Sequence, residues 1–456
     1  MNSKIDTLYN SFYKKIVKLS SKNLNDLELI SITSAADFLY NPRLREQKKT
    51  LKRNYFLEHF KKLLILIRDL AYVFLSLPAL LKLFFTKDIS IVWSGDFFDK
   101  RSKGDFRLGN FYINAYKKKL KFVEFITTSQ LGLFYSLTLF AKRRRTVIYF
   151  DAFIRIIKFF SSYEIDLKKF NDFDEIDQSI IEDNFINILV TKKFLSRKLF
   201  KNVKNVFIWG IYSRTAGIFY WAKKNNLKTV GIMHGLPIKE YVYFETMPGL
   251  SYNEDLKIDY FGVWSNYWQE YYKNNSSMMK NLQISGPLRK KTNFIKSNGD
   301  KFLLLVEPLL EVGEFLKYKK FFEKYSKKID LKVRSDFKFE HLQKYYEYFP
   351  FLKNCKIIQD DIDDVLSKGK YKYCIATHST GILDCLHYGL YPIILHTETW
   401  GNYLKLEKDF IFYDFQEINS FLLKKDINQN KIIYLAQKFS NTGDGSEWVI
   451  DKLMER

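Results

Sequence analysis

A turn of small polar residues in the second half of the chain has the composition of an anion site. His378, Ser379 and Thr380 follow a short apolar run, and Gly381 begins a pattern of helical period. The first amides of a helix lack intrahelical partners and the helix dipole is positive there, so this arrangement favours a phosphate. Asp384, one turn further, could accept hydrogen bonds from a ribose. The alternative is that Ser379 or Thr380 simply caps the helix and that Asp384 is a favourable first-turn charge.

A second histidine, His234, follows an apolar run in the first half of the chain. Gly235 allows a tight turn after it, and Pro237 prevents the strand from continuing. An imidazole there could donate a hydrogen bond to a phosphate or a sugar hydroxyl, although a histidine that only closes a turn explains the spacing equally well. Because His234 and His378 follow strands in opposite halves, we expect different roles for them. His378 would stabilise charge on a leaving phosphate, and His234 would orient the group that attacks.

Four further charged residues follow apolar runs. Asp96 and Asp99 come after Ile89–Trp93, where a carboxylate could take the proton of an attacking hydroxyl. Glu307 and Arg334 come after the first two apolar runs of the second half, and a guanidinium there could bind a phosphate through two hydrogen bonds. Carboxylates are frequent after strands for reasons of turn geometry alone. A solvated loop charge is therefore the alternative for each of these residues.

The elements that must position these residues form two series of short apolar runs alternating with helical segments. Such alternation predicts parallel sheets covered by helices on both faces. The sequence predicts two Rossmann-like doubly wound domains facing a cleft, residues 88–295 and 296–456, after a helical extension of residues 1–87. Ligands bind such sheets beyond the carboxyl ends of the strands, where the polar residues named above lie. The expected strands are Ile89–Trp93, Phe122–Thr127, Val147–Phe150, Val206–Trp209, Thr229–Met233, Tyr260–Trp264, Phe302–Val306, Leu331–Arg334, Cys355–Ile358, Tyr373–Ala376, Pro392–Leu395 and Phe410–Tyr413.

The composition is that of a folded, basic protein. Hydrophobic residues make up 46% and charged residues 27% of the 456 residues, which argues against a disordered chain. Lys and Arg total 74 against 51 Asp and Glu, and the formal net charge of +23 favours polyanions, anionic membranes or phosphorylated ligands. A nucleic-acid binder would cluster basic and aromatic residues in a recognisable module, and no such motif is present. A non-enzymatic polyanion-binding protein is the alternative interpretation of the charge.

Two segments bear on location. Residues 1–20 mix Lys, Asp and Tyr without an uninterrupted apolar stretch, so we expect no secretory signal and a cytoplasmic protein. Leu63–Phe85 is the most apolar segment, but three charged residues interrupt it, whereas a spanning helix needs ~20 apolar residues. We expect it to be buried or to lie on a membrane surface. With the basic residues at 43–53 and 142–145, it favours a peripheral position on anionic lipid at the inner face of the cytoplasmic membrane.

Four segments, taken in order, carry a resemblance. They are His234-Gly-Leu-Pro237, Ile284-Ser-Gly-Pro-Leu-Arg289, His378-Ser-Thr-Gly-Ile-Leu-Asp384 and His387-Tyr-Gly-Leu-Tyr-Pro392. The set resembles GT-B glycosyltransferases of bacterial capsule, lipopolysaccharide and teichoic-acid biosynthesis, in particular the Kdo- and sialic-acid-type transferases. The similarity covers roughly residues 206–395, under half of the chain. Asp384 stands where many relatives carry Glu, which shortens the reach to a ribose.

The resemblance implies roles for these segments. In that group an HG-P loop closes the N-terminal domain, a Gly-Pro loop precedes the interdomain linker, and the hydroxyl turn binds the nucleotide and its phosphates. The catalytic residues that we expect are Asp96, Asp99, His234 and His378. The donor-binding residues that we expect are Gly235, Ser285, Gly286, Pro287, Glu307, Arg334, Ser379, Thr380, Gly381 and Asp384.

The activity that the resemblance implies is inverting, metal-independent transfer of a sugar from a nucleotide-activated donor to a surface polysaccharide or lipid-linked glycan. No cofactor is expected, because the nucleotide-sugar donor is itself a substrate. His378 is similar to the phosphate-facing histidine of CMP-sugar enzymes, which favours a CMP-sugar such as CMP-Kdo or a CMP-sialic-acid-type donor. A UDP-sugar donor, glycerophosphate transfer from a CDP-linked donor and sugar-nucleotide 2-epimerisation are the alternatives.

Overall fold

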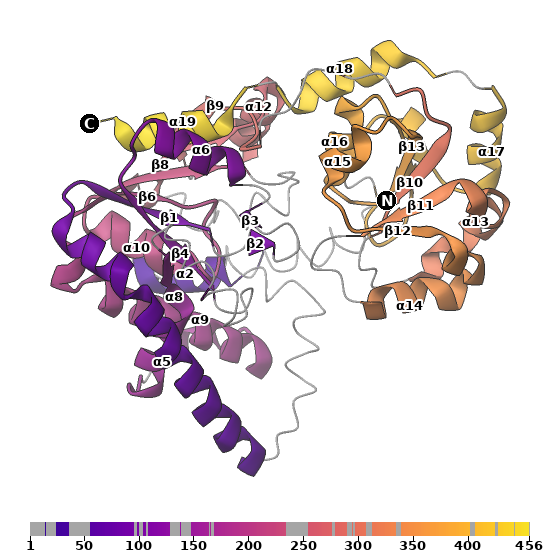
Figure 1. Ribbon diagram of the computed structural model, residues 1–456. Coiled ribbons are helices and arrows are strands. Elements are labelled where there is room, and N and C mark those ends of the chain that lie inside the picture. The colour runs from indigo at the N-terminus through magenta and orange to yellow at the C-terminus, as the bar shows by residue number, and fades with distance from the viewer. Residues whose placement is uncertain are drawn as a thin grey trace. The chain divides into compact units, whose positions relative to one another are not determined.

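The chain folds into two compact units, each built on one parallel sheet, in the computed structural model (Figure 1). The described residues of the seven-stranded unit lie within 14–263, 268–289 and 444–455, and those of the six-stranded unit lie within 264–267 and 294–443. The predicted fold class, two doubly wound α/β units, is confirmed. The structure describes residues 14, 24–35, 55–94, 98–99, 104–105, 108–127, 137, 147–163, 165, 168–233, 254–275, 279–289, 294, 297–306, 312–333, 339–401, 406–424, 427–441 and 443–455.

The sheet of the seven-stranded unit has the order β5-β4-β1-β6-β7-β8-β9, with every neighbouring pair parallel. All residues of its inner strands β1 and β4 are buried, because helices cover both faces. A separate pair of short strands, β2 and β3, is antiparallel. The strands are β1 (Ile89–Trp93), β2 (Phe98–Asp99), β3 (Gly104–Asp105), β4 (Phe122–Ile126), β5 (Val147–Tyr149), β6 (Val203–Phe207), β7 (Lys228–Ile232), β8 (Ile258–Val263) and β9 (Met279–Ile284).

Aromatic side chains join this sheet to its helices. On one face Phe125 of β4 stacks on Phe150 of α8, with ring centroids 4.9 Å apart. On the other face Phe207 of β6 stacks on Phe111 of α6 at 5.7 Å. The helices that cover or flank this sheet are α2 (Asp26–Ser34), α5 (Tyr55–Phe85), α6 (Gly109–Lys117), α8 (Phe150–Phe159), α9 (Glu175–Leu195), α10 (Ala216–Lys224), α12 (Asn266–Asn275) and α19 (Gly445–Met454).

The sheet of the six-stranded unit has the order β12-β11-β10-β13-β14-β15 and is also entirely parallel. The strand order therefore reverses between β10 and β13. Its strands are β10 (Lys301–Leu305), β11 (Ile329–Lys332), β12 (Lys356–Ile358), β13 (Tyr371–Ala376), β14 (Tyr391–Leu395) and β15 (Ile411–Phe412). Its helices are α13 (Lys319–Tyr325), α14 (Phe339–Tyr348), α15 (Ile362–Leu366), α16 (Gly381–His387), α17 (Phe415–Lys424) and α18 (Gln429–Phe439).

The units differ from the expected domains at both ends of the chain. Residues 1–87 are predicted as an extension ahead of the fold, but α2 packs on α9 and α5 packs on β5 and α8, inside the seven-stranded unit. Residues up to 456 are predicted to belong to the second domain, but α19 packs on β6, β7 and β8 of the first sheet. Side chains fix this position: Asn205 Nδ2 donates to the Leu453 carbonyl, and Asn114 Nδ2 donates to Ser446 Oγ at 2.9 Å.

Helix α5 is bound to the unit through its polar residues. Arg155 of α8 donates to both oxygens of the buried Asp69 carboxylate, from Nε at 2.7 Å and from Nη2 at 2.8 Å. The Tyr149 amide donates to Ser76 Oγ at 3.1 Å, and Lys82 Nζ donates to the Phe122 carbonyl at 2.8 Å. Two of the three charges that interrupt Leu63–Phe85 in the sequence, Asp69 and Lys82, therefore anchor the helix to the unit.

Candidate functional site

The hydroxyl turn follows β13 at the carboxyl edge of the six-stranded sheet. Thr377 is buried, and the four residues after it are half-buried. His378 Nδ1 lies 2.8 Å from Thr377 Oγ1, so this hydroxyl holds the imidazole in one orientation. The turn lies where the strand order reverses, because β13 is the neighbour of β10. Open parallel sheets bind their ligands at such a switch point.

Helix α16 begins directly after the turn but is short. It has seven residues, and its N-cap Thr380 makes no side-chain capping hydrogen bond. The Gly381 amide reaches Ser379 Oγ only at 3.4 Å, which is a long contact. Asp384 is half-buried in the first turn of the helix. Because a helix of two turns has a small dipole, the hydroxyls of the turn would have to contribute most of the binding to an anion.

The loop after β14 completes this edge. The Trp400 ring stacks on the His378 ring, with centroids 3.8 Å apart and planes inclined by 12°. The Trp400 amide donates to Thr397 Oγ1 at 3.2 Å. Thr399 donates to the Glu314 carboxylate from its hydroxyl at 2.7 Å and from its amide at 3.3 Å. Glu314 lies in the 3-10 helix Val312–Tyr318, which follows β10. Loops after three neighbouring strands thus converge around His378.

Four residues of this edge are not among those predicted from the sequence: Thr377, Trp400, Thr399 and Glu314. The sequence pattern could have predicted Thr399 and Trp400, because both belong to a polar run that begins directly after β14. Glu314 carried no such signal, because it lies several residues beyond the end of β10 and meets Thr399 only through the tertiary fold. The stacking of Trp400 on His378 likewise joins residues from different strands.

His396, the first residue after β14, makes this unit sensitive to pH. Burial and the neighbouring Lys317 lower the pKa of His396 from its ordinary value of 6.5. In the window below 6.5 the unfolded chain binds a proton that the folded chain does not, so the free energy of unfolding falls as the pH falls through this window. Unfolding of the wild type and of His396→Asn, followed from about pH 8 to pH 5, should show a smaller loss in the variant. Identical pH profiles would show that His396 titrates alike in both states.

Several predicted site residues lie outside the described residues. They are Asp96, His234, Gly235, Glu307 and Arg334. Asp99 lies in β2, paired with Gly104 of β3. Strands β1 and β7 end at Trp93 and Ile232, shortly before residues 96 and 234, as the sequence predicts. The roles assigned to these residues stay predictions.

The loop of Ser285, Gly286 and Pro287 contacts α19. Ser285 Oγ donates to the Gly286 carbonyl at 2.8 Å, and the Gly445 amide donates to the Pro287 carbonyl at 3.0 Å. A Cβ at Gly445 would lie 2.5 Å from the Gly286 oxygen, so the two backbones need a glycine there. These contacts give the loop a structural task, which is to attach the beginning of α19 to the end of β9.

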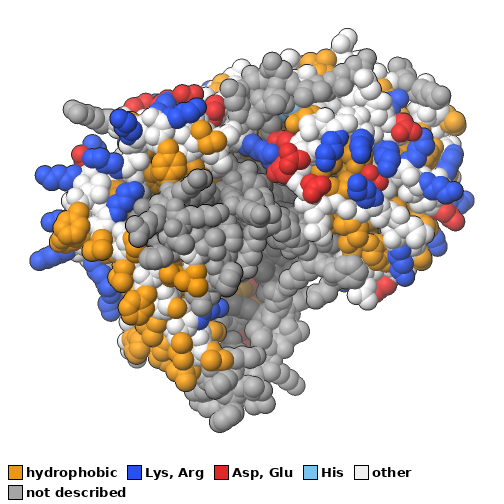
Figure 2. Space-filling view, in the orientation of Figure 1, with side chains coloured by type: hydrophobic (Ala, Val, Ile, Leu, Met, Phe, Trp, Pro, Cys, Tyr) orange, Lys and Arg blue, Asp and Glu red, His pale blue; other side chains and the backbone are white. Residues whose placement is uncertain are grey.

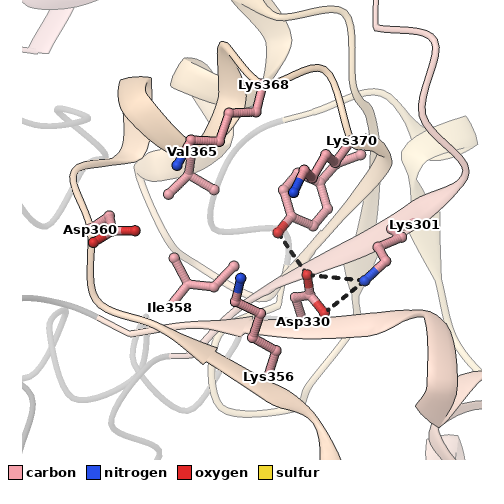
Figure 3. A pocket seen from close by; sticks show the side chains of 9 residues that line it. Lys301, Asp330, Lys356, Ile358, Asp360, Val365, Lys368 and Lys370 are labelled. Carbon is pink, nitrogen blue, oxygen red and sulfur yellow. Dashed lines mark hydrogen bonds and ion pairs between the residues drawn. The ribbon is translucent and has the colours of Figure 1, made fainter.

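A small cavity of about 80 Å³ lies at the opposite, amino edge of the six-stranded sheet (Figure 3). Asp330 is buried beside it, with Tyr371 Oη donating at 2.8 Å and Lys301 Nζ 3.4 Å from its carboxylate. Lys356, Lys368 and Lys370 are among the other residues that line it. Asp330 is already paired, and β10, β11 and β13 contribute only a first or second residue to the lining. We therefore assign the cavity to the packing of the sheet and not to the site after β13.

Comparison of the sequence with protein-family models and with curated proteins finds no match. Among solved structures, S. aureus MnaA with UDP is similar at 13% identity and a TM-score of 0.47, over 80% of this chain and 94% of that chain. The pneumococcal O-GlcNAc transferase GtfA in complex with UDP and GlcNAc is similar at 10% identity and a TM-score of 0.46, over 80% and 99%. S. aureus TarM in complex with UDP is similar at 7% identity and a TM-score of 0.44, over 81% and 96%. Likenesses at these TM-scores do not assign the chain to a family.

Proposed function

We propose that the protein is a glycosyltransferase that takes a sugar from a nucleotide-activated donor and transfers it to a surface polysaccharide or lipid-linked glycan. The observation that carries the proposal is the convergence of a hydroxyl turn, an ordered imidazole and an indole at the switch point of a parallel sheet. A phosphate-bearing ligand is the kind of molecule that such an edge binds.

In this proposal each residue of the turn makes a different contact with the donor. Ser379 and Thr380 donate hydrogen bonds to a phosphate of the donor, a task open to Thr380 because it does not cap α16. When Thr377 donates to Nδ1 of His378, the ring proton lies on Nε2, from which it can be donated to the leaving phosphate. Trp400 keeps the ring in this plane by stacking, and Asp384 accepts hydrogen bonds from the ribose.

The proposed reaction needs a second group, a base for the acceptor hydroxyl. Asp96 and Asp99 are our candidates, with His234 as the residue that orients the acceptor. We further propose that Glu307, Arg334 and Gly235 contact the donor, that transfer is inverting, and that it needs no metal or cofactor. For the loop 285–287 we propose the structural role of holding α19 rather than a donor contact.

The donor nucleotide is the finer point of the proposal. The preference for a CMP-sugar rested on His378 facing a phosphate. That contact does not select CMP, because a UDP-sugar also carries a phosphate next to its sugar, and the hydroxyls of Ser379 and Thr380 together with His378 offer enough hydrogen-bond donors for a diphosphate. We therefore propose a UDP-sugar first and a CMP-sugar second.

A thermal-shift series with UDP, CMP, CDP, GDP and CDP-glycerol tests the proposal directly. A nucleotide present at about 100 times its Kd should add ~2.7 kcal/mol to the stability of the protein. We expect a rise in the melting temperature with UDP, and a smaller one with the other nucleotides. A rise in the melting temperature with CMP alone would indicate a CMP-sugar as the donor. A rise with CDP-glycerol alone would indicate a glycerophosphate transferase. No response to any of them would contradict the proposed function.

The double variant Ser379→Ala with Thr380→Ala tests the turn. Hydrogen bonds to a charged group contribute about 1.5–3 kcal/mol each, so the donor nucleotide should bind at least about tenfold more weakly. The melting temperature without ligand should stay near that of the wild type, because both side chains are half-buried and Thr380 makes no capping bond. Ser367→Ala, at the end of α15 in the same unit, is the matched control. Unchanged nucleotide affinity in the double variant would leave the turn a structural feature only.

A further inference from the structure

Helix α5 is apolar on its outward side as well as on much of the side that packs on the fold. Between Leu63 and Phe85 its buried positions recur every three or four residues, and they include the polar residues Asp69 and Ser76. The full set of buried positions is Asp69, Tyr72, Ser76, Ala79 and Leu83. An ordinary surface helix turns its apolar residues inward and its polar residues outward. Here two polar residues, Asp69 and Ser76, face the fold among the buried apolar ones, and the outward side is apolar.

The outward side of α5 carries what we call the outer stripe. Its members follow one another at alternating intervals of four and three residues, and each is between 44% and 68% exposed. They are Leu63, Ile67, Leu70, Phe74, Leu77, Leu81 and Phe84. Figure 2 shows hydrophobic side chains gathered along this helix. At 1.5 Å per residue the stripe is about 33 Å long, and soluble monomers rarely expose a continuous apolar surface of such extent.

Between Leu63 and Phe85, the part of α5 whose side chains the structure describes, the charged residues do not interrupt the stripe. Asp69 receives hydrogen bonds from Arg155 of α8 and, at 3.2 Å, from the neighbouring Arg68. Lys82 turns toward the sheet, where its Nζ donates to the Phe122 carbonyl and lies 5.6 Å from the centre of the Phe122 ring. Within Leu63–Phe85 the polar contacts of Asp69 and Lys82 are therefore directed toward the fold, and the outward half of this segment consists of apolar side chains.

The contacts of Asp69 and Ser76 with the fold determine whether α5 can cross a bilayer or only lie on its surface. Leu63–Phe85 is long and apolar enough to cross a bilayer. Crossing would separate Asp69 from Arg155 and Ser76 from the Tyr149 amide, and would leave a carboxylate in hydrocarbon. The helix is instead placed to lie flat, with its packed side on the protein and its outer stripe away from it.

The width of the apolar side favours a bilayer over a second helix. Most positions beside the outer stripe are also apolar; they are Leu64, Leu66, Ala71, Val73, Pro78, Leu80 and Phe85. The exception is Lys82, on the same flank as Leu64, whose ammonium group is directed to the Phe122 carbonyl. A helix pair usually carries Glu and Lys at such positions, where they form salt bridges that select the partner. One partner helix would leave these side chains in water, whereas a membrane surface covers all of them. Phe159 and Phe160 are two further exposed apolar residues, at the end of α8, the helix that packs on α5.

We propose that α5 lies in the interface of an anionic bilayer, with the outer stripe at the boundary between headgroups and acyl chains. The net charge of +23 supplies the attraction that brings the protein to such a surface. The proposal concerns where the protein is held. It does not depend on the proposed function, because nucleotide binding and vesicle binding are measured separately.

Flotation of the full chain with lipid vesicles tests this proposal. We expect binding to phosphatidylcholine vesicles that contain phosphatidylglycerol, and weaker binding to phosphatidylcholine alone. Phe74→Ser with Leu81→Ser should reduce binding about tenfold or more, because two apolar side chains leave the acyl boundary. Both side chains are exposed, so the fold should be unaffected; the melting temperature checks this. The matched control is Leu423→Ser with Tyr434→Ser, two exposed apolar residues of the six-stranded unit, which should bind as the wild type does.

Three outcomes would overturn the proposal. The first is a wild type that does not float with either vesicle. The second is equal binding by the wild type and the Phe74/Leu81 variant, which would assign binding to basic residues alone. The third is a wild type that sediments as a dimer and does not bind vesicles, while the Phe74/Leu81 variant sediments as a monomer. That last result would make the outer stripe an interface between two copies of this chain.

Discussion

His378→Ala should lower the rate of sugar transfer about 100-fold while leaving donor affinity close to that of the wild type. The reason is that, on the proposed function, the imidazole interacts with charge that develops only as the nucleotide departs. An interaction made only in the transition state raises the rate without changing ground-state binding. The measurement is kcat with the donor that the thermal-shift series identifies, together with the Kd of its nucleotide.

Two further variants separate catalysis from structure. His396→Asn changes a second histidine at the same edge of the sheet, whose ring centroid lies 4.4 Å from that of Tyr413. This variant should keep the wild-type rate of transfer near neutral pH. Thr377→Val keeps the His378 ring but removes its hydroxyl partner, so it should move the pH profile of kcat. A His378→Ala enzyme with the wild-type rate would reduce the imidazole to a stacking partner of Trp400.

Arg155→Met should lower the free energy of unfolding of the seven-stranded unit by about 3–5 kcal/mol. It removes two hydrogen bonds from the Asp69 carboxylate, whose side chain is only 1% exposed. Arg68 remains near this carboxylate at 3.2 Å, but its own side chain is 43% exposed. A buried charge without its principal partner costs more than the ion pair itself contributes. Hydrogen exchange of the α5 and α8 amides measures the effect within the unit concerned.

The controls for Arg155 use the same helix. Lys158→Met removes an exposed pair with Asp183 and should cost less than about 1 kcal/mol. Asp69→Leu combined with Arg155→Met should recover much of the loss, because the fully buried charge is then gone, while the pair of Arg155 with the partly exposed Asp151 is lost in both variants. If Arg155→Met and Lys158→Met lowered the free energy of unfolding by the same small amount, the buried Asp69 carboxylate would not need Arg155 for its stability.

The parallel strands could be predicted from sequence because buried strands appear as short apolar runs. Strand β9 was missed because Lys280, Asn281 and Gln283 make it a polar edge strand. The order of strands within each sheet carries no comparable local signal. The same limit applies to the site. The turn at Ser379 can be predicted from its residue types, but the contact of Trp400 with His378 depends on β13 and β14 being neighbours in the sheet.

Long-range contacts explain the remaining differences. The hydrogen bond from Asn205 to the Leu453 carbonyl joins residues 248 positions apart, and no local pattern in residues 444–455 distinguishes a helix of one unit from a helix of the other. The outer stripe of α5 differs from these long-range contacts, because its apolar residues can be recognised in the sequence. Only the structure shows that Asp69 and Ser76 point inward.

The return of α19 to the first sheet has a consequence for biosynthesis. A ribosome adds residues at about 5–20 per second, so roughly ten to thirty seconds separate the synthesis of β9 from that of α19. During this interval β6, β7 and β8 are complete but lack the helix that covers them. The nascent seven-stranded unit must therefore wait, with part of its apolar face open to chaperones, while the whole six-stranded unit is being made.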